Sequence, residues 1–215
     1  MKKFIIIIII LILIAIVGIE TYYVINNKNK TNSNENNNNI IEENKNNNKN
    51  NSNPTNKKIL VVYYSAQNHT EKVAKKIASN LNTDIFEIEP KDVYKSDDLD
   101  WTNDKSRVSK EHDDESLRNV ELKTTKVENF DSYDTILIGY PIWWGVAAWP
   151  VNTFVKANNF NGKTVIPFCT SASSDIGNSG NLLENVAGSG NWLSGQRFSS
   201  NPSDNDIKSF TDSIK

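Results

Sequence analysis

The sequence predicts a doubly wound α/β fold, with a parallel sheet between two layers of helices, in residues 57–215. Strand-like segments there alternate with segments whose apolar residues recur at helical spacing, which is typical of this fold class. The first such segment, Ile59–Tyr64, is a continuous apolar run, as expected of a central parallel strand buried on both faces. A polar loop and a helical pattern follow it directly, so the unit reads strand, loop, helix.

The remaining elements follow in the same alternation. The expected strands are Ile59–Tyr64, Asp84–Glu89, Thr135–Tyr140, Thr164–Cys169 and, with a weaker pattern, Trp192–Phe198. The expected helices cover Val73–Leu81, Pro150–Ala157, Leu182–Ala187 and Asp204–Ile214. Pro150 suits the first turn of its helix, where no backbone N–H donor is needed.

Residues 1–56 have no pattern of a globular core. Residues 1–25 begin with lysines and continue from Phe4 to Ile19 without a polar side chain, which predicts a single membrane anchor or, alternatively, a cleaved secretory signal. Asparagine supplies 17 of the 31 residues in 26–56, so this segment is expected to be a disordered linker. The predicted organisation is therefore anchor or signal (1–25), linker (26–56) and globular domain (57–215).

Charge and composition exclude several classes of partner. Residues 57–215 carry 18 Lys and Arg against 22 Asp and Glu, without the basic patch that nucleic acid requires. Cys169 is the only cysteine, and the two histidines are His69 and His112, so neither a disulfide nor a site rich in cysteine or histidine ligands is expected. We therefore expect no metal, and we expect Cys169 to be a buried residue at the end of its strand.

Three unusual loops follow predicted strands. We call Ser65–Thr70 the first loop, Gly139–Pro150 the tryptophan loop and Cys169–Gly177 the serine loop. Ligands of doubly wound sheets bind outside the carboxyl ends of the strands, where these loops would meet. A helix N-terminus suits a phosphate, tryptophans suit a flat ring, and small hydroxyl residues allow close backbone approach. Together they predict a flavin nucleotide.

Each loop also has a simpler interpretation. The first loop could be an ordinary capped turn, Trp143 and Trp144 could fill a core, and the serine loop could be a solvated connection. His69 could be a catalytic base or metal ligand, but a hydrogen-bonding role in the first loop is favoured. The acidic stretches 97–100 and 113–115 could steer a basic redox partner or could simply be solvated.

From about Lys57 to the C-terminus, the chain resembles the flavodoxin family. The residues that carry the resemblance are Tyr64–Thr70, Tyr140–Gly145 (YPIWWG) and Gly162–Ser171, in the expected order. The resemblance implies a five-stranded sheet in the order 2-1-3-4-5 with one non-covalent FMN at its carboxyl edge. It implies the following FMN-binding residues: Ser65, Ala66, Gln67, Asn68, His69 and Thr70 at the phosphate, Pro141, Ile142, Trp143, Trp144 and Gly145 beside the ring, and Thr170 and Ser171 on its other side. Asn68 departs from the glycine common in the family, although asparagine tolerates the left-handed conformation.

The function expected from these features is FMN-dependent electron transfer at a membrane surface, to or from a redox partner protein or a membrane donor. A rival is a self-contained reductase of a quinone or similar acceptor, and another is a flavin-free module that binds a partner through its tryptophans. No catalytic side chain is expected, because the flavin carries the chemistry. Lysines flank both ends of the apolar segment, so the charge rule for membrane orientation is nearly balanced. Because a basic and then apolar N-terminus is typical of exported proteins, our hypothesis is that the domain lies outside the cytoplasm.

Overall fold

The computed structural model of the protein describes residues 57–214. The predicted anchor or signal (1–25) and the predicted linker (26–56) lie outside these described residues. Among residues 57–214, no helix is long and apolar enough to cross a membrane.

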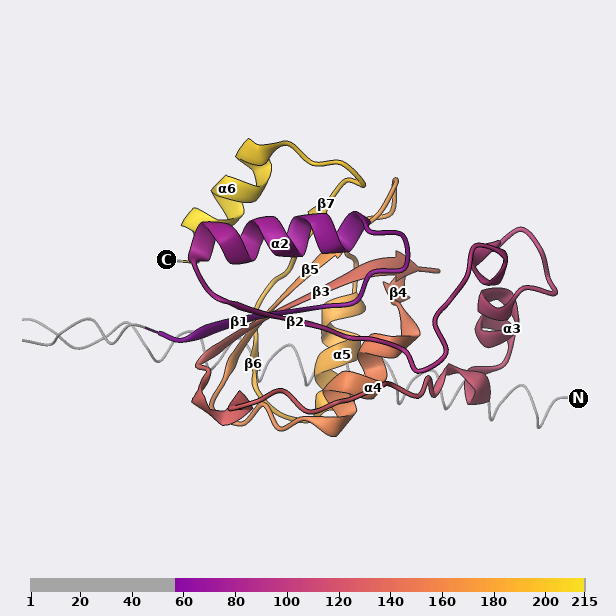
Figure 1. The fold of residues 1–215 in the computed structure, drawn as a ribbon, viewed down its shortest axis with the longest axis horizontal. Helices are drawn as coiled ribbons and strands as arrows, with labels where there is room; N and C mark the ends of the chain where they lie inside the picture. The colour runs from indigo at the N-terminus through magenta and orange to yellow at the C-terminus, as the bar shows by residue number, and fades with distance from the viewer. Residues whose placement is uncertain (1–56, 215) are drawn as a thin grey trace, which may run out of the picture. The chain divides into compact units, whose positions relative to one another are not determined.

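A parallel sheet forms the centre of the described domain (Figure 1). Its strands are β1 (Ile59–Tyr63), β2 (Asp84–Glu87), β3 (Thr135–Trp143), β5 (Thr164–Thr170), β6 (Asn191–Trp192) and β7 (Gln196–Phe198). They lie in the order β2-β1-β3-β5-β6, and β7 also pairs with β5. Counting β5 as the fourth parallel strand and β6 with β7 as the fifth, this is the predicted 2-1-3-4-5 order. A short strand, β4 (Val146–Ala147), pairs antiparallel with the end of β3.

The fifth strand is interrupted, whereas the sequence predicted one strand over Trp192–Phe198. Thr164 pairs with Asn191 and Phe168 pairs with Gln196, so the edge strand has one more residue than β5 between these pairs. Pro167 lies in this part of β5 and has no N–H for the ladder. Gly195 passes so close that a Cβ atom there would lie 2.7 Å from the Pro167 carbonyl oxygen. The extra residue is accommodated as a break in the strand.

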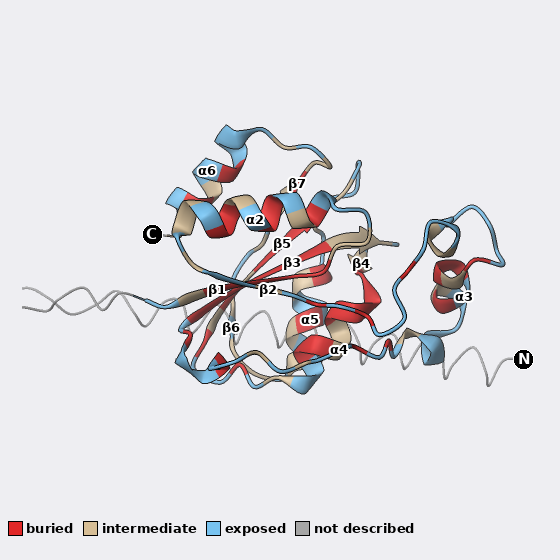
Figure 2. Ribbon diagram, in the orientation of Figure 1, coloured by how far each residue is buried: buried red, intermediate tan, exposed pale blue. Residues whose placement is uncertain are grey.

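Two helical layers cover the sheet. Figure 1 shows α2 (His69–Leu81) and α6 (Asp204–Asp212) on one face, with α4 (Trp149–Ala157) and α5 (Ser179–Ala187) on the other. Successive side chains of β1 point to opposite faces of the sheet. Val61 and Tyr63 join the core beneath α2, and Leu60 and Val62 join the core on the other side. Figure 2 shows the central strands mostly buried, and Leu60 to Tyr63 of β1 are all buried, which confirms that β1 is a strand buried on both faces.

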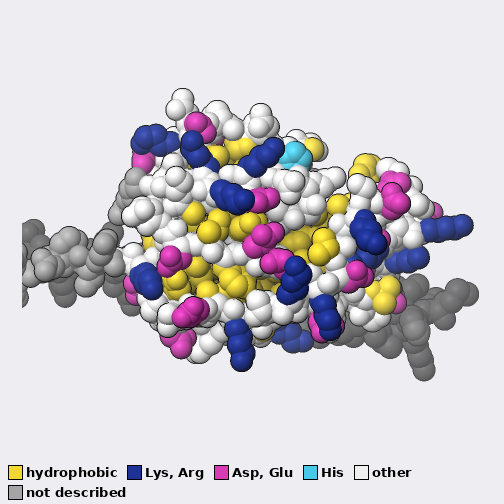
Figure 3. Space-filling view, viewed as in Figure 1, with side chains coloured by type: hydrophobic (Ala, Val, Ile, Leu, Met, Phe, Trp, Pro, Cys, Tyr) yellow, Lys and Arg dark blue, Asp and Glu magenta, His cyan; other side chains and the backbone are white. Residues whose placement is uncertain are grey.

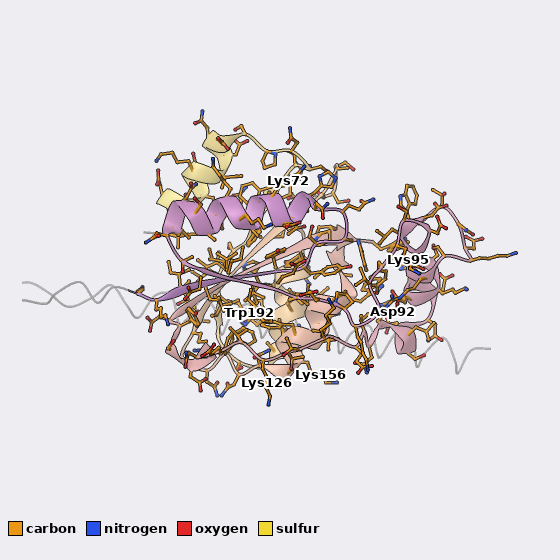
Figure 4. The ribbon with its side chains drawn as sticks, viewed as in Figure 1. Lys72, Asp92, Lys95, Lys126, Lys156 and Trp192 are labelled. Atoms are coloured by element: carbon orange, nitrogen blue, oxygen red, sulfur yellow. The ribbon has the colours of Figure 1, made fainter. Side chains whose placement is uncertain are left out.

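A helical segment between β2 and β3 was not predicted. It contains α3 (Arg107–Asp113) and the 3-10 helices η1 (Asp97–Leu99) and η2 (Glu115–Arg118), and the short η3 (Phe130–Ser132) follows before β3. Ser106 is the N-cap of α3, since its side chain accepts a hydrogen bond from the Ser109 N–H. In Figure 4, Asp92 and Lys95 mark the start of this segment. The acidic stretches are thus part of a folded lobe.

Some boundaries differ from those predicted. β1 and β2 end at Tyr63 and Glu87, where Tyr64 and Glu89 were predicted. Helix α5 begins at Ser179, earlier than the predicted Leu182, and α6 ends at Asp212. Proline in the first turn of α4 is confirmed. Figure 3 shows Lys and Arg interspersed with Asp and Glu over the face in view.

Candidate functional site

A cavity of about 550 Å³ lies at the carboxyl edge of the sheet. The register of the strands places the ends of β1, β3 and β5 side by side, with Pro141 opposite Thr170. The predicted site residues that line the cavity are Ser65, Ala66, Gln67, His69, Thr70, Pro141, Ile142, Trp143, Trp144, Thr170 and Ser171. Asn68 and Gly145 were also predicted but do not line it. The volume lies in the usual range for a small-molecule site.

The first loop presents a run of backbone donors. None of the N–H groups from Ser65 to Glu71 donates a hydrogen bond to another residue of the described domain. The last of these groups belong to the N-terminus of α2, where the helix dipole favours an anion. Asn68 adopts the left-handed conformation (φ 63°, ψ 0°) immediately before the helix, as its residue type allows. A run of N–H groups without partners that leads into a helix N-terminus suits a phosphate.

Two hydrogen bonds tie the first loop to other walls of the cavity. The Nδ1 atom of His69 lies 2.8 Å from the carbonyl oxygen of Ser200, and because that oxygen only accepts, Nδ1 carries the proton. The buried hydroxyls of Thr70 and Thr170 lie 2.7 Å apart and join the start of α2 to the end of β5. His69 therefore has the hydrogen-bonding role that the sequence favoured, and it fixes the position of the loop.

Trp143 stands among three other aromatic rings. Its ring centroid lies 5.9 Å from that of Tyr64, 5.2 Å from that of Tyr94 and 5.7 Å from that of Trp149. The interplanar angles, 89°, 69° and 75°, are those of edge-to-face contacts. No described ring lies parallel to Trp143, although its side chain lines the cavity. Trp143 is thus held on its sides by aromatic neighbours.

Trp144 has a different environment. Its ring is stacked on that of His112 in α3, with centroids 4.3 Å apart and an interplanar angle of 7°. Trp144 and Gly145 both have positive φ, 46° and 81°, and they form the two-residue turn between β3 and β4. This geometry matches a hairpin turn of type I′, in which a tryptophan is strained by about 1–2 kcal/mol. Gly145 is therefore the second residue of this turn.

A partly buried ion pair supports the wall that carries Trp143. Glu111 is 5% exposed, accepts a hydrogen bond of 2.8 Å from Arg107 Nε and another of 2.6 Å from the Tyr94 hydroxyl. The Arg107 guanidinium also lies over the Tyr94 ring, 3.8 Å from its centroid. Burial, followed by the hydrogen bond to Glu111, raises the pKa of Tyr94. Burial likewise raises the pKa of Tyr64, so both phenols stay protonated.

Several cavity residues were missed by sequence reasoning. Leu99, Trp101 and Val108 come from the lobe between β2 and β3, and Ser200 comes from the segment after β7. Trp101 is 70% exposed although its backbone is fixed by hydrogen bonds from its N–H to Leu99 and from the Ser109 hydroxyl to its carbonyl. The only signal in the sequence was a tryptophan within an acidic stretch, which does not indicate a cavity by itself.

Cys169 takes no part in the cavity. It is fully buried in β5, and burial raises the pKa of its thiol to about 12, despite a lowering effect of Arg197. The thiol is therefore protonated and unreactive near neutral pH, as expected of a buried residue at the end of a strand. Among the described residues, no group of histidine, cysteine and acidic side chains has the arrangement of a metal site.

A family profile and two solved structures match the described domain over nearly its whole length. A family profile described as flavodoxin matches residues 58–214. A flavoprotein structure from Bacteroides eggerthii is 40% identical, covers 73% of this chain and 97% of its own, and superposes with a TM-score of 0.66. A flavoprotein structure from Bacteroides uniformis is 38% identical over 73% of this chain and 98% of its own, with a TM-score of 0.67. A Lactobacillus acidophilus flavoprotein in complex with FMN is 25% identical, covers 66% and 93%, and has a TM-score of 0.47. A search of curated proteins found no match.

Proposed function

The chain belongs to the flavodoxin family, and from this premise we propose that its cavity binds one FMN non-covalently and that the protein transfers electrons. The observation that carries the proposal is the run of N–H groups from Ser65 to Glu71, which have no acceptor within the described domain. Within this run, Ser65, Ala66, Gln67, His69 and Thr70 line the same cavity as Trp143. A ligand with an anionic end and a flat ring satisfies both walls, and FMN is such a ligand.

The residues of the cavity have separate tasks in this proposal. The N–H groups of the first loop and the N-terminus of α2 bind the phosphate, and the bond from His69 to Ser200 keeps them in place. Trp143 packs against the ring, while the tryptophan loop excludes water from that side. Bound FMN supplies one- and two-electron chemistry, so no side chain of this domain needs to act as acid, base or nucleophile.

The acidic charge of the lobe between β2 and β3 supports the proposal that the redox partner is basic. Residues 92–118 carry nine Asp and Glu against five Lys and Arg, and the rest of residues 57–215 is balanced. The lobe contributes Leu99, Trp101 and Val108 to the cavity, so its charge lies beside the proposed electron-transfer site. A negative field there speeds the approach of a positively charged partner and weakens with added salt.

The experiment that tests the proposal is the spectrum of the purified chain. A yellow protein is expected, and the flavin released on denaturation should be FMN instead of FAD, because one donor loop accommodates a single phosphate group. A chain that stays colourless after incubation with FMN would remove the redox function and favour the flavin-free binding module.

We propose that the domain is held at a membrane by residues 1–25 and reaches its partner on a linker of residues 26–56. As a flexible chain, a linker of that length spans about 30 Å. The outward orientation predicts that protease added to intact cells cuts the linker and releases a folded fragment. Cleavage only after the cells are broken would place the domain in the cytoplasm.

A reductase acting on a flat organic acceptor is the second candidate function. The observation that favours it is Trp101, a large aromatic side chain that borders the cavity and is 70% exposed. An exposed aromatic ring at a cavity suits a planar apolar molecule. Turnover of a quinone with a soluble reductant, lost in Trp101→Ala while FMN stays bound, would support this function over electron exchange with a protein.

A further inference from the structure

Arg197 in β7 organises the serine loop from the edge of the sheet. Its Nη2 donates to the carbonyl oxygens of Ser171, at 3.0 Å, and Ala172, at 3.1 Å. Its Nε donates to the Ser171 hydroxyl at 3.1 Å, and that hydroxyl in turn donates to the carbonyl oxygen of Ser174. Three carbonyl groups of the loop are thus occupied within the protein.

The opposite sides of the same peptide groups are unoccupied. In a planar trans peptide, the N–H points away from the C=O of the preceding residue. The Ala172 N–H shares a peptide group with the Ser171 carbonyl, and the Ser173 N–H shares one with the Ala172 carbonyl. Because Arg197 holds both carbonyls, these two N–H groups point away from Arg197. Neither N–H donates to any residue in the described range, and both residues line the cavity. This wall of the cavity consequently offers donors and few acceptors.

Ser171 itself supports the loop. Its N–H donates to the carbonyl of Phe198, its carbonyl accepts from Arg197, and its hydroxyl both accepts and donates within the protein. All of its polar groups are engaged within the protein, whereas the N–H groups of Ala172 and Ser173 are not. Within the described domain, Arg197 forms no ion pair with a carboxylate at 4.0 Å or less. Its planar fork of donors, which lysine lacks, fits adjacent carbonyl groups.

We propose that Arg197 is a positioning residue that directs the N–H groups of Ala172 and Ser173 into the cavity, where they bind the acceptor-lined edge of the flavin ring. The proposal rests on the proposed binding of FMN and adds the residue that shapes the ring-binding wall. Arg197 acts through the geometry of its fork, and its hydrogen bonds to Ser171 and Ala172 go to the serine loop, so the effect is expected at the ring wall and not at the phosphate.

Titration of the purified full chain, freed of flavin, with FMN and with riboflavin tests this role. Arg197→Lys keeps the charge but loses the fork, and it should weaken both ligands by the same factor, about tenfold. Equal effects on the two ligands identify the ring wall, because riboflavin lacks the phosphate. Ser171→Ala removes the shared hydroxyl but keeps the bonds from Arg197 to the carbonyls, and it should weaken both ligands less than Arg197→Lys does.

The matched control is Lys163→Met. Lys163 is another cation that clamps backbone carbonyls, those of Tyr133 at 2.8 Å and Asp131 at 3.3 Å, but it precedes the opposite end of β5. It should lower thermal stability and leave both affinities unchanged. Amide resonances of the serine loop should shift in flavin-free Arg197→Lys while those of α2 do not.

Three outcomes would overturn the inference. They are wild-type affinity in Arg197→Lys, a loss confined to FMN, and a loss in Ser171→Ala as large as that in Arg197→Lys. If the wild-type chain binds neither ligand, the proposed function itself fails. If the wild-type chain binds both and Arg197→Lys behaves as described, the two proposals stand together.

Discussion

Trp143 and Trp144 are adjacent in sequence, yet replacing each with alanine should have different effects on FMN affinity. Trp144 places one face of its ring on His112, 4.3 Å away, whereas no described ring lies parallel to Trp143. Trp143 is therefore expected to be the ring that stacks on the flavin. One stacked contact with its burial is worth about 1–3 kcal/mol, so Trp143→Ala should weaken FMN binding by about 5- to 150-fold.

The effect on folding can be separated from the effect on binding. Trp143→Ala removes three edge-to-face pairs, each worth about 0.5–1.5 kcal/mol, so the free energy of unfolding should fall by about 2–4 kcal/mol. Trp144→Ala removes the stack on His112 and a nearly parallel contact with Trp149 at 6.3 Å, should cost about 1–3 kcal/mol, and should change FMN affinity less than about threefold.

Fluorescence titration of the flavin-free chain with FMN measures the affinity, and urea unfolding without FMN measures the stability. Trp143→Phe is the matched variant, since it keeps an aromatic ring at the position and should recover part of the affinity. A loss of affinity in Trp144→Ala equal to or greater than that in Trp143→Ala would refute the reasoning, because the flavin would then displace His112 or stack on the other face of Trp144.

Three further predictions concern Asn68, the pair of Glu111 and Arg107, and Cys169. Asn68→Ala should lower stability by about 1 kcal/mol in urea unfolding, because alanine tolerates the left-handed conformation poorly, while Asn68→Gly should match or exceed wild type. Glu111→Gln should lower the unfolding free energy by about 1–3 kcal/mol, and combining it with Arg107→Met should cost less than the sum of the single changes. Burial raises the pKa of the Cys169 thiol from 9.0 to about 12, so the folded state holds this proton more tightly than the unfolded state does. Its contribution to stability should be complete below pH 9 and disappear towards pH 12, and alkaline unfolding of Cys169→Ala should lack that component.

Local pattern in the sequence is sufficient for most of the fold. The continuous apolar run of β1, the helical spacing in α2 and the proline of α4 each report burial or backbone geometry within a few neighbouring residues. Asn68 likewise has the left-handed conformation that its residue type permits. The sequence also indicated which loops would meet, because the carboxyl ends of parallel strands lie at one edge of the sheet.

The sequence was least informative where the structure depends on contacts between distant segments. The interruption of the fifth strand depends on Gly195 passing against Pro167, and neither residue reveals the other in a local window. The lobe that contains α3 lacks a strong apolar period, and it folds around the buried Glu111, its partner Arg107 and the ring of Tyr94. Its acidic surface therefore resembled a solvated connection.

Residue patterns along the chain are sufficient for the α/β architecture, the three loops at one sheet edge and the residue types suited to a phosphate and a flat ring. Only the folded domain shows which tryptophan is stacked on His112, which is held edge-on, and which carbonyls of the serine loop are fixed by Arg197. Periodicity records whether a residue is buried, whereas the orientation of a ring or a peptide group is set by partners far away in the chain.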